Sequence, residues 1–165
     1  MNEFIMLVGM PGAGKSTIAE EYVEHGFTVH SPDIIRNKLN LHSLDDTAKV
    51  FDIMHDNMIE DMKCDKDIIY DSTNLSRRRR MTVLNLIKEF GYHKTCIALI
   101  VPIEVCKERN SKRTGHSKVS NYEYEIAVNI FNLPTFDEGW DNIKIDIQDS
   151  RLEIIWEYIM KHFLF

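Results

Sequence analysis

The residues Gly9 to Thr17, GMPGAGKST, have the types and spacing of a loop that binds phosphate groups. They match the pattern G-x-x-x-x-G-K-[ST], with an apolar run before it and a helical pattern after it, as the motif requires. The glycines let backbone N–H groups converge on phosphate oxygens at a helix N-terminus. Lys15 is expected to reach the β- and γ-phosphates, and the Ser16 hydroxyl to bind Mg²⁺. The ATP-binding residues predicted in this loop are Gly12, Ala13, Gly14, Lys15, Ser16 and Thr17.

The class of phosphate-binding protein is indicated by residues outside the loop. A GTPase would need an N-K-x-D segment that reads the base, whereas NKLN at Asn37 to Asn40 lacks the aspartate and lies too early in the chain. A kinase needs a carboxylate near the acceptor hydroxyl and mobile arginines over the transferred phosphoryl group. Candidates for both are present, which favours a kinase.

The candidate carboxylate is Asp33, in the segment HSPDIIR that follows the second apolar run. The carboxyl ends of parallel strands share one edge of a sheet, so Asp33 is expected near the phosphates, where it would act as the general base. The alternative for Asp33 is an ordinary helix N-cap. Arg36 lies three residues further on and would share a face with Asp33. It is expected to hold a phosphate of the acceptor, unless it is a solvated surface arginine.

The candidate mobile arginines lie in ERNSKR, which a polar, glycine-containing stretch follows. Arg109 and Arg113 are four residues apart and would share one helical face. Their planar guanidinium groups can each bridge two phosphate oxygens, so we predict that both bind ATP and that Arg113 is catalytic. The segment at about 109–120 is expected to form a lid. A basic, solvated helix end is the alternative.

Short apolar runs alternate with longer amphipathic segments along the chain, which is typical of a parallel sheet covered by helices. The expected fold is α/β, with a central five-stranded parallel sheet, helices on both faces and a lid. The expected strands lie near Phe4–Val8, Phe27–His30, Asp67–Tyr70, Thr95–Val101 and Ile143–Ile147. The expected helices are Lys15–Glu24, Asp46–Lys63, one after a Ser76 cap, Ile103–Lys112, Asn121–Asn132 and a last one after Ser150.

Composition predicts a soluble cytoplasmic protein with one domain, residues 1–165. The net charge of −6, from 20 basic and 26 acidic residues, would repel nucleic acid, so a polyanion must be met by a local patch. Three cysteines without C-x-x-C spacing and scattered histidines indicate neither a disulfide framework nor a metal site. The N-terminal apolar run is too short for a membrane span. The methionines of 46–63, Trp140 and Trp156 are expected to pack in the core.

Four segments in this order, GMPGAGKST, SPDIIR, YDSTNLSRRRR and VPIEVCKERNSKR, resemble the kinase domain of phage polynucleotide 5′-hydroxyl kinases. The similarity extends over about residues 6–120 and implies a three-layer P-loop kinase fold. The resemblance implies that Lys15 and Ser16 serve the donor phosphates and the metal, that Asp33 activates the 5′-hydroxyl, that Arg36 contacts the acceptor phosphate and that Arg113 clamps the ATP.

The sequence also departs from the phage pattern. The D-x-D-G-T motif that begins the phosphatase domain of those enzymes is not found, so we expect only the kinase half. Their aspartate stands directly before Thr-Asn-Leu, whereas here Ser72 takes that place and Asp71 precedes it. Side chains alternate along a strand, so Asp71 either reaches the metal through water or caps a turn. Thr73 and Asn74 are expected to line the acceptor side.

A run of four arginines, Arg77 to Arg80, opens the predicted helix behind Ser76. Positive charges at a helix N-terminus are destabilising, so local stability does not account for the run. This helix starts at the same sheet edge as Asp33, where a polyanion would offset the repulsion. We therefore expect Arg78 to bind the acceptor. The alternative is that the arginines are solvated or paired with acidic residues.

The sequence as a whole predicts an ATP- and Mg²⁺-dependent kinase that phosphorylates a 5′-hydroxyl end of DNA or RNA. A kinase acting on a small metabolite or nucleoside stays open as an alternative. A third class, a nucleotide-binding module or regulatory ATPase, has no acceptor. Asp33 and the lid arginines argue against that class, because binding alone needs neither a base nor a mobile clamp.

Overall fold

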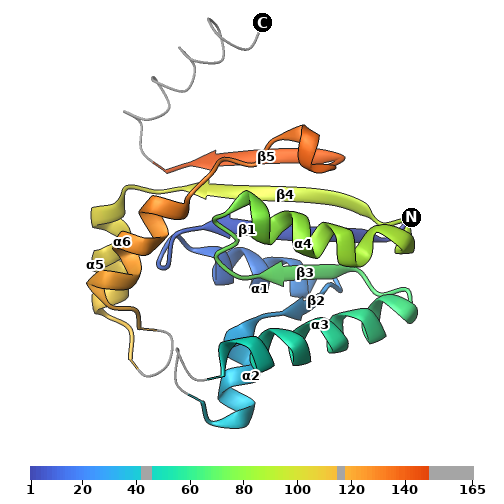
Figure 1. Ribbon diagram of the computed structural model, residues 1–165, viewed down its shortest axis with the longest axis horizontal. Helices are drawn as coiled ribbons and strands as arrows, with labels where there is room; N and C mark the ends of the chain where they lie inside the picture. Colours follow the sequence, from blue (N-terminus) through green and yellow to red (C-terminus); the bar gives the residue numbers. More distant parts are fainter. Residues whose placement is uncertain (42–45, 115–117, 149–165) are drawn as a thin grey trace, which may run out of the picture.

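The computed structural model describes residues 1–41, 46–114 and 118–148 of the chain, and within them a five-stranded parallel sheet forms the centre (Figure 1). The strands are β1 (Glu3–Gly9), β2 (Thr28–His30), β3 (Ile68–Asp71), β4 (His93–Ile100) and β5 (Asn142–Ile147). Their order across the sheet is β2-β3-β1-β4-β5, with every neighbouring pair parallel. The predicted α/β fold is confirmed.

Helices connect the strands, as parallel pairing requires. They are α1 (Lys15–Glu24), α2 (Pro32–Leu39), α3 (Thr47–Lys63), α4 (Arg77–Ile87), α5 (Ile103–Ser111) and α6 (Asn121–Ile130), with short 3₁₀ turns η1 (Lys88–Phe90) and η3 (Phe136–Glu138). The predicted helix after Ser150, including Trp156, and part of the predicted lid lie outside the described residues. None of the described helices is long and apolar enough to cross a membrane.

The central strand β1 is buried on both faces, which explains its uninterrupted apolar sequence. Alternate side chains point to opposite faces. Phe4, Met6 and Val8 pack into the core formed with α3 and α4, whereas Ile5 and Leu7 pack on the side covered by α1. Layers of helices on both sides of the sheet therefore fix the edge where β1 ends and the glycine loop begins.

The long helix α3 supplies the methionine-rich part of the core. Met54, Met58 and Met62 are buried at helical spacing beneath the sheet, as the sequence predicts. Trp140 is also buried, and its indole N–H donates to Glu138 over 3.1 Å. Both packing predictions are confirmed.

Helix α2 is an element that the sequence analysis did not predict. Ser31 is its N-cap, with an extended backbone and a side-chain oxygen that accepts from the Asp33 N–H over 3.3 Å. Pro32 follows at the first helical position, where its fixed φ and missing N–H are tolerated. The alternative that Asp33 is itself the N-cap is therefore wrong. The cap leaves the Asp33 side chain available to the cavity described below.

A buried ion pair explains part of the arginine run. Arg80 and Glu138 have fully buried side chains, and the Arg80 Nη2 lies 2.6 Å from Glu138 Oε1. The other guanidinium donors reach the carbonyls of residues 74, 75, 132 and 133. Arg77 pairs with Asp137 at the surface, 2.9 Å apart. The inference that local stability explains none of the four arginines is thus corrected: two of them join α4 to η3.

Candidate active site

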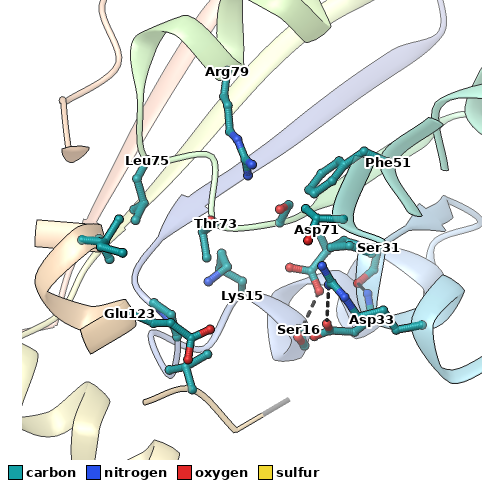
Figure 2. A pocket seen from close by; sticks show the side chains of 18 of the residues that line it. Lys15, Ser16, Ser31, Asp33, Phe51, Asp71, Thr73, Leu75, Arg79 and Glu123 are labelled. Carbon is teal, nitrogen blue, oxygen red and sulfur yellow. Dashed lines mark hydrogen bonds and ion pairs between the residues drawn. The ribbon is translucent and has the colours of Figure 1, made fainter. Parts of the chain in front are cut away.

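A cavity of about 380 Å³ opens where β1, β2 and β3 end (Figure 2). The glycine loop and the first turn of α1 form its floor, and α2 and α3 form one wall. The opposite wall comes from the start of α4 and from α6. The volume is within the range of sites that bind small molecules and cofactors. Segments far apart in the sequence thus meet at the sheet edge that the sequence analysis predicted.

The glycine loop has the backbone that phosphate binding requires. Gly12 has φ +86°, and a Cβ there would lie 2.4 Å from the Cys106 carbonyl oxygen, so only glycine fits. Gly14, with φ +100°, is the residue before α1. Ala13 is fully buried and contributes its backbone to the loop, while Thr17 is exposed on the first turn of α1. The loop is held from outside by Tyr124 of α6, whose hydroxyl lies 2.7 Å from the Pro11 carbonyl oxygen and 3.1 Å from that of Cys106.

Lys15 lies at the centre of the cavity and is only 8% exposed. Its Nζ donates to the carbonyl oxygens of Gly9 and Met10, both at 2.9 Å. Burial lowers the pKa of this lysine to about 8, with a smaller contribution from Arg113, while Asp71 opposes the shift. A phosphate group in the loop would favour the charged form, because it places negative charge beside the ammonium group.

Ser16 and Asp71 are brought together at the end of β3. The Ser16 hydroxyl donates to Asp71 Oδ2 over 3.0 Å. Burial raises the pKa of Asp71, and this effect is opposed by Lys15 and by the hydrogen bond from Ser16. A hydroxyl and a carboxylate are oxygen ligands of the kind that Mg²⁺ takes together with water and substrate phosphates. The donor set therefore fits Mg²⁺, although no cluster of three or more His, Cys, Asp or Glu side chains occurs in the described part of the chain.

Asp33 and Arg36 face the same cavity from α2, as their spacing predicts. The Arg36 Nη1 lies 3.4 Å from Asp33 Oδ1. The Asp33 side chain is 53% exposed and can meet an incoming group, whereas that of Arg36 is 9% exposed. The buried Arg36 Nε has no hydrogen-bond partner among the described residues. A guanidinium group that lines the cavity is suited to an anionic ligand.

The two predicted lid arginines have different positions. Arg113 lines the cavity, close enough to Lys15 and Asp71 to affect the pKa of both. Arg109 lies outside the cavity, behind the glycine loop, where its Nη1 donates to the Gly12 carbonyl over 3.4 Å. Residues 115–117 of the predicted lid are not among the described residues. Arg113 thus lies in the cavity, and Arg109 contacts the glycine loop from outside it.

The residues predicted on the acceptor side are only partly brought into the cavity. Thr73 lines it, and the Thr73 carbonyl accepts from the Gly9 N–H over 3.1 Å. Asn74 is buried and donates to the Leu7 carbonyl over 2.7 Å, so it joins the turn after β3 to β1. Arg78 is exposed and does not line the cavity, whereas its neighbour Arg79 does.

Sequence reasoning also missed several lining residues. Phe51 on α3 is half-buried and packs partly against the core, so its apolar pattern does not mark it as a lining residue. The residues that α6 contributes to the wall are Glu123, Ile126, Ala127 and Ile130. No motif marks them, because α6 enters the site only through the tertiary packing of its N-terminal half on the loop.

The fold and the site define a P-loop nucleotide-binding protein of the kinase type. The family model described as AAA domain, AAA_33, matches residues 4–127, and the chain belongs to this family. A bifunctional polynucleotide phosphatase/kinase of Schizosaccharomyces pombe is 30% identical over 147 residues, covering 86% of this chain and 33% of that protein. The chain spans about a third of the length of this relative and of a similar protein of Acanthamoeba polyphaga mimivirus.

Solved structures share the fold at lower identity. A chain of the Pnkp1/Rnl/Hen1 RNA repair complex superimposes with a TM-score of 0.66 at 22% identity, covering 79% of this chain and 46% of that chain. The APS kinase CysC of Mycobacterium tuberculosis, in complex with AMPPNP and APS, gives a TM-score of 0.59 at 18% identity, covering 96% and 95% of the two chains. At these identities the likeness shows the P-loop kinase fold alone.

Proposed function

We propose that the protein transfers the γ-phosphoryl group of ATP to a 5′-hydroxyl end of DNA or RNA. The observation that carries this proposal is that Asp33 and Arg36 face the same cavity as Lys15 and Ser16. A base and an anion-binding arginine next to a phosphate loop are what a phosphorylated acceptor with a free hydroxyl requires. The relatives described as polynucleotide phosphatase/kinases support this choice of acceptor.

Each side chain then has a role in the transfer. Asp33 accepts the proton of the acceptor hydroxyl while the hydroxyl oxygen bonds to the γ-phosphorus and the bond from that phosphorus to the ADP oxygen breaks. Lys15 and Arg113 offset the charge that spreads over the phosphoryl oxygens. Ser16 and Asp71 would hold Mg²⁺, which supplies further charge neutralisation at the phosphates. Arg36 holds the acceptor through its phosphate.

A kinase that acts on a small metabolite or nucleoside is the second candidate. It is favoured by the modest size of the cavity and by the likeness in fold to APS kinase, whose structure contains a small acceptor. The net charge of −6 also does not attract a long polyanion. A regulatory ATPase is less well supported, because it would have no use for Asp33 and Arg36 in this arrangement.

The test is phosphoryl transfer from γ-labelled ATP with Mg²⁺ to a panel of 5′-hydroxyl oligonucleotides, nucleosides and nucleoside 3′-monophosphates. Lys15→Ala should abolish transfer to every acceptor, because it removes the charge beside the phosphates being separated. Lys63→Ala, an exposed lysine paired with Glu60, is the matched control and should retain activity. Transfer to nucleosides but to no oligonucleotide would reject the polynucleotide proposal in favour of the second candidate.

A further inference from the structure

Arg79 differs from Arg77 and Arg80 in having no carboxylate partner, and from Arg78 in lining the cavity. Arg77 and Arg80 have carboxylate partners, as described above. Within the described part of the chain, the Arg79 guanidinium makes no hydrogen bond or ion pair, although its backbone N–H is capped by Ser76 over 3.3 Å. It points into the cavity from the first turn of α4, where its charge is opposed by the helix dipole (Figure 2). Among the described residues, no carboxylate offsets this unfavourable charge.

The contact that Arg79 does make is with an aromatic ring. Its guanidinium carbon lies 5.0 Å from the centroid of the Phe51 ring, across the cavity wall formed by α3. Phe51 is itself part of a row of rings, since it lies 6.0 Å from His55, which stacks on Tyr70 at 5.9 Å. The His55 Nε2 and the Tyr70 hydroxyl are 2.9 Å apart. The ring beneath Arg79 is thus anchored to the core through β3.

A guanidinium that lies over a ring has a second planar face, and that face suits a nucleobase. Proteins that bind single-stranded nucleic acid stack bases on arginine planes and on aromatic rings. The wall formed by α6 is apolar here, and Ile126 and Ile130 are each 42% exposed, which is unusual for isoleucine. The Arg36 guanidinium lines the same cavity and can bind an anion. The cavity therefore offers both an apolar, planar surface and an anion site, the two features that a nucleotide acceptor presents.

We propose that the Phe51–Arg79 pair is a stacking platform for the nucleobase of the acceptor's 5′-terminal nucleotide. The inference rests on the proposed function and specifies it further, because it makes the base, and not only the phosphates, part of what the site recognises. The platform binds any base, since every base has a π face, and discriminates nucleotides from other phosphorylated alcohols.

The test compares two acceptors that carry the same phosphates. One is a 5′-hydroxyl oligonucleotide, and the other is the same oligonucleotide with an abasic tetrahydrofuran residue at its 5′ end. The parent protein should prefer the base-bearing acceptor by roughly 5- to 150-fold in kcat/KM, the range that loss of one stacked base produces. Arg79→Lys keeps the positive charge but removes the planar guanidinium group, and Phe51→Leu removes the aromatic ring beneath it. Each should reduce the preference to less than about threefold, whereas Arg77→Lys on the same helical turn should retain it.

The ratio of the two acceptors is insensitive to partial misfolding, because misfolding lowers both rates together. If Arg79→Lys kept the parent's preference for the base-bearing acceptor, whatever its absolute rates, Arg79 would not recognise the base and the platform would be overturned. Equal phosphorylation of both acceptors by the parent protein would overturn the platform while leaving the proposed function in place. Phosphorylation of neither would reject the proposed function itself, and the inference with it.

Discussion

Replacing Arg80 with alanine should destabilise the protein more than any other change in the arginine run. Both oxygens of the buried Glu138 carboxylate accept from Arg80, at 2.6 and 2.7 Å. Four backbone carbonyls accept from the same guanidinium, at distances of 2.9 to 3.3 Å. Arg80→Ala leaves the buried carboxylate with only the more distant Arg77, whose Nη1 lies 3.8 Å from Glu138 Oε1. Breaking a buried pair in this way costs about 3 to 5 kcal/mol of unfolding free energy.

The assay is urea unfolding followed by circular dichroism, with thermal unfolding alongside. A loss of that size should lower Tm by roughly 6 to 20 °C for a chain of this length. Arg77→Ala is the matched control, because Arg77 lies on the same helix and pairs with Asp137, the residue before Glu138, but at the surface. It should cost less than about 1 kcal/mol. If Arg80→Ala proved no more destabilising than Arg77→Ala, the assignment of Arg80 as a structural link between α4 and η3 would be refuted.

Three further outcomes are expected. Asp33→Asn should retain ATP affinity and lower kcat by roughly 10² or more, as for loss of a positioned base; reduced ATP affinity with normal kcat would make Asp33 structural. Gly12→Ala should weaken ATP binding, measured by calorimetry, because the new Cβ would clash with the Cys106 carbonyl oxygen. Gly26→Ala, whose Cβ would have nothing within 4 Å, should leave ATP binding intact. Equal ATP affinities of the two variants would contradict the loop assignment. Glu138→Gln should be less stable than the parent at pH 7. Burial opposes ionisation of Glu138, but the Arg80 and Trp140 hydrogen bonds outweigh it and lower its pKa from 4.5. The charged carboxylate therefore adds stability above pH 4.5, and this stability is lost as the pH falls through the lowered pKa. A stability difference between the parent and Glu138→Gln that stayed constant down to about pH 2.5 would contradict this.

The sheet and most helices were predictable because their sequence patterns are local. Burial requires apolar side chains, and this produces the apolar runs of β1, β3 and β4 and the 3.6-residue period of α3. Helix α2 was missed because its eight residues contain only a short apolar pattern, although Ser31 followed by Pro32 is a recognisable N-terminal signal. A serine cap followed by proline predicts a helix that begins at Pro32.

The donor end of the site was predictable for a related reason: the phosphate loop is one continuous motif. The acceptor end is assembled from α2, α3, α4 and α6, and no local pattern records which side chains meet there. The arginine run illustrates the difficulty. Arg79 and Arg80 are identical residues at adjacent positions, yet Arg79 faces the cavity and Arg80 is fully buried. Only the partner Glu138, 58 residues away, distinguishes them.

The Tyr124 hydroxyl lies between the carbonyl oxygens of Pro11 and Cys106, and so ties α6 to the glycine loop and to α5. The same helix carries Ala127 and Ile130 to the far wall of the cavity. We expect a nucleotide that displaced the loop to shift this far wall as well. The affinities for nucleotide and acceptor would then be coupled, and linkage would require each to change the affinity for the other by the same factor.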